Sequence, residues 1–425
     1  MTNRLQSTAR RLIGSYPRSF WIIAVADVFP TGVGHMLVFP FLAFYATNRF
    51  GVGMTQVGLL FTAMAVCDVL GSMLGGALSD RFGRKPVLAL GQLGSGFAVL
   101  LMGWAESFPS FFTLAMLVCL IGSTGGPARS AMMTDLLPGE KLPAGFGILR
   151  VVGGLTFVIG PLIGGLLATG SYAPLFIIKF ATNAFAAATI LLTVRETRPA
   201  EDGENEPASL TRTLTGYRKV LRDVPFLLFL GATMLVFGSL GQVQRGALSV
   251  YLRDLHGISE QGFGLLMSLN GFLVILLQLP IAKLISRFHP MATMGAGALL
   301  IAGGFWIFGG SSSYGLFMAA MIVIAVGQMV LLPTNRFVIA RLSPTRMRGR
   351  YIGAAGLGVS AAQAVGPVFA GLVMDHLDPR WVWYGAGTLG LIAVTWFLML
   401  RRHTDPRLDR EPAAHVSPSP ARGST

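Results

Sequence analysis

The chain has 425 residues, of which 53% are hydrophobic and only 12% charged, and its formal net charge is +14. A water-soluble protein of this size needs many more charged side chains on its surface, so the composition excludes a soluble globular domain. Nucleic-acid binding is also excluded, because the basic residues lie in short loops and tails beside apolar segments and not in one patch.

Apolar segments of about 20 residues recur along the chain and predict twelve membrane-spanning helices, since β-barrel alternation is absent. In lipid, a helix satisfies its own backbone hydrogen bonds. The predicted spans cover residues 20–45, 55–79, 87–105, 110–133, 146–168, 172–194, 224–251, 260–284, 291–311, 314–339, 352–375 and 381–400. Cys67 and Cys119 both fall inside spans, which favours packing roles over a disulfide or a metal site.

The spans group into two bundles, residues 1–195 and 224–402, joined by a charged linker at 196–223. Residues 403–425 form a polar, Pro- and Ser-containing tail that we expect to be disordered. Basic residues concentrate in the loops on one side of the predicted membrane, and the positive-inside rule makes that side cytoplasmic. We therefore expect a protein of the cell's inner membrane with both termini in the cytoplasm.

The two bundles repeat each other at a constant offset of 206 residues. Corresponding pairs include Gly58 and Gly264, Arg81 and Arg287, Pro127 and Pro333, Gly160 and Gly366, and Pro161 and Pro367. Six spans per repeat is an even number, so both repeats have the same orientation in the membrane. This parallel repeat predicts an all-α fold with a central site between two six-helix bundles.

The loop after the second span, Gly76 to Lys85, strongly resembles motif A of the major facilitator superfamily. The resemblance implies a fold of twelve spans and a gate that locks the cytoplasmic side in the outward-facing state. Gly76 is expected to allow close helix contact and Gly83 a tight turn. The resemblance assigns gating roles to six residues: Gly76, Asp80, Arg81, Gly83, Arg84 and, as the acid that an arginine would meet, Asp135. The second repeat keeps Arg287 and Phe288 but replaces the aspartate by Ser286, so its gate is weaker or absent.

The fifth span resembles the core of motif C, which the family associates with antiporters. Its residues are Gly160, Pro161, Gly164 and Gly165. Ordinary packing of small residues in a membrane helix explains the same pattern. Motif B lacks its usual arginine in the fourth span, and Arg129, nearer the cytoplasmic end, is the candidate to replace it.

Acidic side chains inside membrane spans are costly and usually have a task, so Asp27 is the leading candidate for proton coupling, with a paired structural acid as the alternative. Thr31 and His35 follow at four-residue spacing on the same face of the helix. Asp68 is the second candidate acid, although a structural role near motif A explains it equally well. His35 could relay protons or serve as structural polarity, and Lys179 is expected to snorkel toward the membrane surface.

In the second bundle, the candidates for the substrate cavity are polar and mostly amides. They are Gln242, Arg245, Asn270, Gln328 and Gln363, in addition to Asp27 and Thr31. Snorkelling of Arg245 at the outer end of its span is an equal alternative.

The sequence thus predicts a secondary active transporter similar to the bacterial twelve-span multidrug:proton antiporters, exporting apolar or cationic small molecules by alternating access. Its partners would be the substrate, protons and the lipid bilayer, without nucleic acid; it would act as a monomer and use the proton gradient in place of a cofactor. The alternative is a proton-coupled importer or facilitator of a sugar or organic acid. A membrane sensor would need a soluble domain that neither tail provides, and no nucleophile–base pair, metal cluster or phosphate loop predicts an enzyme.

Overall fold

The computed structural model describes residues 15–197, 219–244, 246–344 and 347–402. Within these ranges the regular structure is helical, and twelve helical segments are long and apolar enough to cross a membrane. The twelve spans predicted from hydropathy are confirmed, and several extend by a turn or more beyond the predicted bounds.

The first bundle contains six spans. They comprise α2 (Arg18–Ile22), η1 (Ile23–Val28), α3 (Phe29–Val38), η2 (Phe39–Phe41) and α4 (Leu42–Phe50) as the first span, then α5 (Met54–Phe82), α6 (Arg84–Met102), α7 (Phe108–Gly122) with α8 (Gly125–Leu136), η3 (Gly139–Lys141) with α9 (Leu142–Ala168), and α10 (Ala173–Thr193).

The second bundle repeats this plan. It comprises α12 (Val224–Gln244) followed by α13 (Ala247–His256), then α14 (Glu260–Ile285), α15 (Pro290–Gly310), α16 (Tyr314–Leu342), α17 (Arg348–His376) and α18 (Arg380–Arg402). The repeat extends to local geometry: Gly51 and Gly257, 206 residues apart, end α4 and α13 in the left-handed region with φ of 65° and 63°. Glycine adopts that conformation without the steric cost of a Cβ.

Hydropathy predicts the first span as one uninterrupted helix, whereas the structure shows two irregular turns within it. A six-residue π-helical segment, η1, contains Asp27, and a 3₁₀ turn, η2, contains Pro40. The π segment ends just before Pro30, whose ring nitrogen cannot donate to the preceding turn. Such π segments are rare and occur frequently at functional sites.

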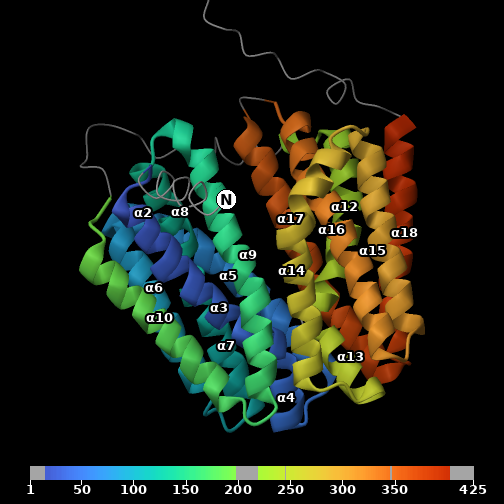
Figure 1. Ribbon diagram of the computed structural model, residues 1–425, viewed down its shortest axis with the longest axis horizontal. Helices are drawn as coiled ribbons and strands as arrows, with labels where there is room; N and C mark the ends of the chain where they lie inside the picture. Colours follow the sequence, from blue (N-terminus) through green and yellow to red (C-terminus); the bar gives the residue numbers. More distant parts are fainter. Residues whose placement is uncertain (1–14, 198–218, 245, 345–346, 403–425) are drawn as a thin grey trace, which may run out of the picture.

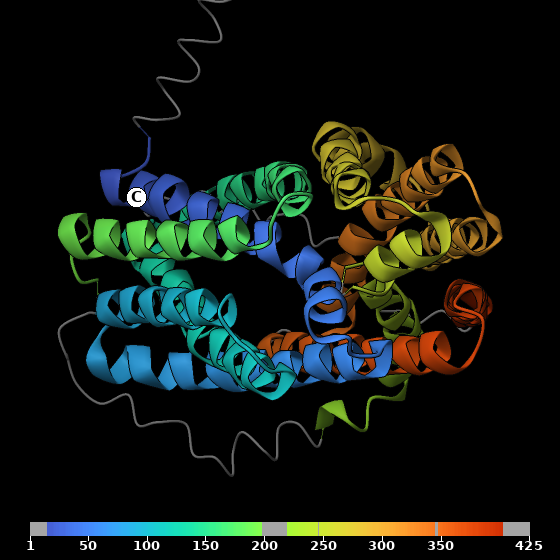
Figure 2. The ribbon, with the colours of Figure 1, turned by 90° about the horizontal axis from the view of Figure 1, so that it is seen from below.

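The two bundles lie side by side and touch mainly along two helix pairs, α5 with α17 and α9 with α14 (Figures 1 and 2). Glycines permit these contacts. A Cβ on Gly165 would lie 2.7 Å from the carbonyl oxygen of Glu260, and one on Gly58 would clash with the backbone of Pro367. The close approach therefore depends on small residues at the interface.

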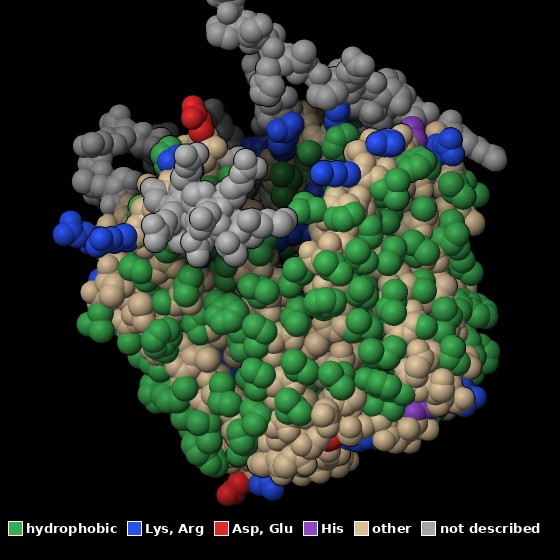
Figure 3. Space-filling model, viewed as in Figure 1, with side chains coloured by type: hydrophobic (Ala, Val, Ile, Leu, Met, Phe, Trp, Pro, Cys, Tyr) green, Lys and Arg blue, Asp and Glu red, His purple; other side chains and the backbone are tan. Residues whose placement is uncertain are grey.

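One end of the molecule carries both the start of α2 and the end of α18, and we call it the basic end (Figure 1). Its loops and helix ends hold a cluster of basic residues: Lys85, Lys141, Lys283, Arg287 and Arg348. The opposite end, where α4 and α13 meet, is the closed end. Figure 3 shows a hollow between the two bundles at the basic end, with Lys and Arg side chains around it.

Hydrogen bonds between the bundles, among the described residues, lie in the middle of the molecule and toward the closed end. Ser268 Oγ donates to the carbonyl of Val158 over 2.7 Å, and Tyr172 donates to Glu260 over 2.8 Å. The backbone N–H groups of Met54 and Thr55 donate to the carboxylate of Asp375 over 2.8 and 2.7 Å. The structure is therefore closed at one end and open toward the basic end.

Candidate functional site

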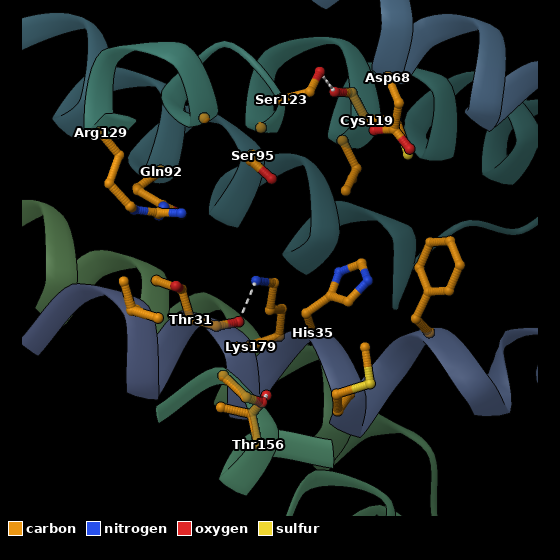
Figure 4. A pocket seen from close by; sticks show the side chains of 18 of the residues that line it. Thr31, His35, Asp68, Gln92, Ser95, Cys119, Ser123, Arg129, Thr156 and Lys179 are labelled. Carbon is orange, nitrogen blue, oxygen red and sulfur yellow. Dashed lines mark hydrogen bonds between the residues drawn. The ribbon is translucent and has the colours of Figure 1, made fainter. Parts of the chain in front are cut away.

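A cavity of about 560 Å³ lies inside the first bundle, lined by residues from all six of its spans, among them the end of the π segment (Figure 4). A second cavity of about 540 Å³ lies between α5 and α17 of the other bundle. Asp68 and Ser72 line both cavities, which therefore adjoin. Together they form a polar chamber whose first half belongs entirely to the N-terminal bundle.

Asp27 has 0% of its side chain exposed, and its partner is Arg129 of α8, which lines the chamber. The Nε of Arg129 donates to Asp27 Oδ2 over 2.5 Å, and its Nη2 donates to Oδ1 over 3.2 Å. Gln92 Nε2 also donates to Oδ1 over 3.2 Å. A bidentate arginine pair and an amide donor thus compensate a carboxylate that would otherwise be costly in the membrane.

Asp27 belongs to a closed circuit of hydrogen bonds across the first span, α6 and α10, and Arg129 attaches α8 to this circuit. Asn183 Nδ2 donates to the carbonyl of Gln92 over 3.1 Å, and Lys179 Nζ donates to Asn183 Oδ1 over 2.8 Å. Lys179 Nζ also donates to the carbonyl of Thr31 over 3.2 Å, and the Thr31 hydroxyl donates to the carbonyl of Asp27 over 2.6 Å. Asp27 is therefore linked through hydrogen bonds to α6, α8 and α10.

The snorkelling predicted for Lys179 is wrong. Its side chain is 7% exposed, lines the chamber and lies inside the bundle (Figure 4). A hydropathy profile does not indicate which side of a helix a single lysine lies on. That this lysine lies toward Asn183, inside the bundle, follows only from the packing of α10 against its neighbours. Asn183, Gln92 and Arg129 complete the site, and the first two were not singled out from the sequence.

Thr31, His35 and Asp68 all line the chamber, as does Asp27's partner Arg129. His35 is exposed to it and stacks on Phe39 with ring centroids 4.6 Å apart. Asp68 projects from α5 on the opposite side of the chamber from His35 (Figure 4). Of the three residues predicted for proton coupling, His35 and Asp68 thus line the chamber, and Asp27 is paired with the chamber residue Arg129.

The motif A residues lie at the basic end, where α5 ends and α6 begins. Gly83 has φ of 98° and separates the two helices, so it makes the expected tight turn. Arg84 forms an ion pair with Asp135 of α8, the acid expected to meet an arginine. Glu196, which the sequence did not suggest, accepts hydrogen bonds from the N–H groups of Arg84 and Lys85 at the start of α6.

The close helix contact expected at Gly76 is not made: a Cβ there would meet nothing within 4 Å. The bundles diverge at the basic end, so no facing helix approaches this glycine. Asp80 is exposed at the same end, and the ring of Phe82 lies under the guanidinium of Arg81 at 5.3 Å.

The motif C residues pack α9 on both sides. A Cβ on Gly160 would clash with Met36, and one on Gly164 would lie 2.6 Å from Phe41, both in the first span. Gly165 faces α14, and Pro161 lies within α9. These residues thus hold the fifth span against the first span and against the second bundle.

Among the described amide candidates of the second bundle, Asn270, Gln328 and Gln363 line neither cavity. Asn270 Nδ2 donates to Gln328 Oε1 over 3.4 Å, which joins α14 to α16 within that bundle. Gln363 of α17 lies beside Gly241 of α12. Arg245 and the side chain of Gln242 fall outside the described part of the structure.

Comparison with known proteins gives the same picture. The family model of the Major Facilitator Superfamily matches residues 28–252 and 242–424. A Na(+), Li(+), K(+)/H(+) antiporter of Planococcus maritimus is 27% identical over 402 residues, covering 88% of this chain and 92% of that protein. The multidrug resistance protein MdtH of Shigella sonnei is 26% identical over 405 residues, covering 89% and 94%.

Among solved structures, a mutant of the nucleoside transporter NupG superposes with a TM-score of 0.80 at 14% identity, covering 90% of this chain and 100% of that one. At this identity the likeness concerns the fold alone. The twelve spans, the two parallel bundles, the motif A loop and the match of the family model along nearly the whole chain lead to one conclusion: the chain is a transporter, not an enzyme, and it belongs to the Major Facilitator Superfamily.

Proposed function

We propose that this protein exports apolar or cationic small molecules in exchange for protons, with the Asp27–Arg129 pair as the coupling element. The observation that carries the proposal is the position of this pair. A fully buried carboxylate lies on the π segment of the first span, and its charge is matched by Arg129, an arginine from another helix that lines the chamber.

Protonation of Asp27 would remove the negative charge that holds Arg129. The guanidinium, 25% exposed in its present position, would then turn toward the chamber and repel a cationic substrate. Deprotonation would restore the pair. Binding of a proton to Asp27 therefore disfavours binding of a cationic substrate, and the reverse. Exchange of one for the other requires this mutual exclusion.

The lining of the chamber supports an organic substrate. Met36, Phe39, Val118 and Phe157 contribute apolar surface beside the hydroxyl groups of Ser72 and Thr156. A volume of about 560 Å³ lies in the range of drug-sized binding pockets. The match to a multidrug resistance protein over most of both chains points in the same direction.

We further propose that the basic end faces the cytoplasm of a bacterial inner membrane, in accordance with the positive-inside rule. The structure is open toward that end, so it would represent the state that loads substrate from the cytoplasm. Alternation would then require rocking of the two bundles about the chamber.

Everted membrane vesicles with an imposed pH gradient test the proposal. Wild-type protein should accumulate a fluorescent cationic dye such as ethidium, and Asp27→Asn should lower gradient-driven uptake at least tenfold. Because the asparagine leaves Arg129 without its counter-ion at a cost of about 3–5 kcal/mol, the double variant Asp27→Asn with Arg129→Gln controls for misfolding. Asp378→Asn, an exposed acid at the closed end, should behave as wild type. Full gradient-driven uptake by Asp27→Asn would exclude the coupling role.

Exchange of a monovalent metal cation for protons is a second candidate, favoured by the relative from Planococcus maritimus and by Asp68, a carboxylate that lines both cavities. In the same vesicles it predicts that Na⁺ or Li⁺ dissipates the pH gradient without any dye uptake. Import of a sugar or organic acid instead predicts proton-driven accumulation in right-side-out vesicles.

A further inference from the structure

The second bundle has its own segment at the position of motif A, and a cavity of about 380 Å³ lies beside it at the basic end. The end of α14, the start of α15 and the middle of α16 enclose the cavity. Its walls are mainly apolar, with Ile285, Phe288, Pro290, Pro333 and Phe337 among them. The proposed transport mechanism does not use this space.

The offset of 206 residues shows what fills the same place in the first bundle. There Pro290 corresponds to Arg84, Phe337 to Ala131 and Arg341 to Asp135. Arg84 forms its ion pair with Asp135 and donates to the carbonyl of Ala131 over 3.4 Å. In the second bundle the inserted arginine is therefore replaced by proline, and the acid that received it is replaced by a base.

The net charge around the motif A position also differs between the two bundles. The first bundle has three acids there, Asp80, Asp135 and Glu196, and three bases, Arg81, Arg84 and Lys85, so the net charge is zero. The corresponding residues of the second bundle are Ser286, Arg341, Arg402, Arg287, Pro290 and Met291, whose net charge is +3. Lys283, where the first bundle has Ala77, adds a fourth positive charge.

The positive charge lies next to exposed apolar surface. The guanidinium of Arg341 lies 5.1 Å from the ring centroid of Phe337, which lines the cavity. Phe288 and Phe337 are 61% and 44% exposed. Lys283 and Arg287 are exposed on the last turn of α14 and just beyond it. An apolar hollow with a cationic rim at the membrane boundary matches an amphipathic anion.

We propose that this cavity binds one anionic phospholipid from the leaflet at the basic end. The phosphate would contact Arg341, with Lys283 and Arg287 at the rim, and an acyl chain would enter the hollow between Phe288 and Phe337. The phosphate would thus lie beside Arg341, at the position that corresponds to Asp135 in the first bundle. Basic pockets between membrane helices are suited to anionic headgroups, and charge-assisted bonds to phosphate are strong.

Native mass spectrometry of the full-length protein in mild detergent tests the assignment, with dioleoyl phosphatidylglycerol and dioleoyl phosphatidylcholine added separately. One phosphatidylglycerol should be retained more tightly than phosphatidylcholine. Arg341→Gln should weaken this binding about fivefold, the effect expected from one basic residue near an anionic headgroup. The exposed Arg195 lies at the same end in the first bundle, so Arg195→Gln is the matched control and should change nothing.

A second variant rebuilds the first bundle's arrangement in the second. Pro290→Arg combined with Arg341→Asp should fill the hollow with an internal ion pair and abolish the tight lipid. Equal retention of the two lipids, or unchanged binding by Arg341→Gln, would overturn the proposal. So would a severalfold gain in lipid binding when the linker acids Glu201, Asp202, Glu204 and Glu206 are neutralised, because the linker would then be the natural occupant.

Discussion

Asp375 joins the two bundles at the closed end, and its substitution should open that end. The carboxylate, at the end of α17, accepts hydrogen bonds from the N–H groups of Met54 and Thr55, the first residues of α5. These groups have no partner within their own helix, and the helix dipole adds favourable electrostatics for an anion there. Asp375→Ala removes both bonds and the charge from the interface.

The size of the effect follows from the geometry. A hydrogen bond to a charged group contributes about 1.5–3 kcal/mol, which suggests about 3–6 kcal/mol for the two. Asp375 is solvent-exposed, however, so the charge is screened and the net value falls to about 1–2 kcal/mol. The population of molecules open at this end should therefore rise by about 5- to 30-fold relative to the closed form.

Spin labels on Glu106→Cys and Ser312→Cys report this change, since both residues are exposed and lie in corresponding loops at the closed end. Double electron–electron resonance should show a new population at longer distance in Asp375→Ala. The control Asp378→Asn removes an acid that accepts a bond only from Arg380, within its own turn. An unchanged distance distribution in Asp375→Ala would refute the idea that this cap contributes to closure.

Three further predictions concern the interior, motif A and the closed end. Lys179→Met should lower the free energy of unfolding by about 2 kcal/mol, because it leaves Asn183 and the carbonyl of Thr31 without their donor; a snorkelling lysine would give no change in SDS unfolding. Arg84→Gln and Asp135→Asn should each destabilise the protein, and a double-mutant cycle should show coupling of about 1 kcal/mol, whereas strict additivity would deny the pair. Burial, and then the charge of Arg380, lowers the pKa of His256 on α13. The unfolded state therefore binds the proton first, so stability should fall as the pH drops below about 6.5, and His256→Gln should flatten this dependence in thermal melts.

Much of the fold follows from local patterns in the sequence. Hydropathy alone locates twelve spans, and the offset of 206 residues pairs Gly51 with Gly257 before any helix cap is known. Asp27 could be chosen as the central acid because a carboxylate is expensive in a membrane wherever it lies. The identity of its partner could not be chosen in the same way, since Arg129 is 102 positions away and meets Asp27 only through tertiary packing.

The same limit explains the errors. Lys179 and Gly76 were assigned from their own spans, but the environment of each depends on a helix from elsewhere: the first span and α6 around Lys179, and the absence of a facing helix at Gly76. The π segment was equally invisible, because one extra residue in a turn changes no property that a hydropathy profile measures.

That π segment makes the first span intolerant of changes in length. In an α-helix each residue turns the chain by about 100°, so the wider turn around Asp27 sets the angular phase between the two parts of the span. Removing one residue from Ile23–Val28 would return the helix to regular winding and turn the Phe20 and Trp21 side relative to the chamber side. Asp27 and the rings of Phe20 and Trp21, whose centroids lie 5.3 Å apart, could then no longer both keep their neighbours. The two parts of the first span are therefore held at one fixed rotation relative to each other. The number of residues between them is as important to the site as the carboxylate of Asp27.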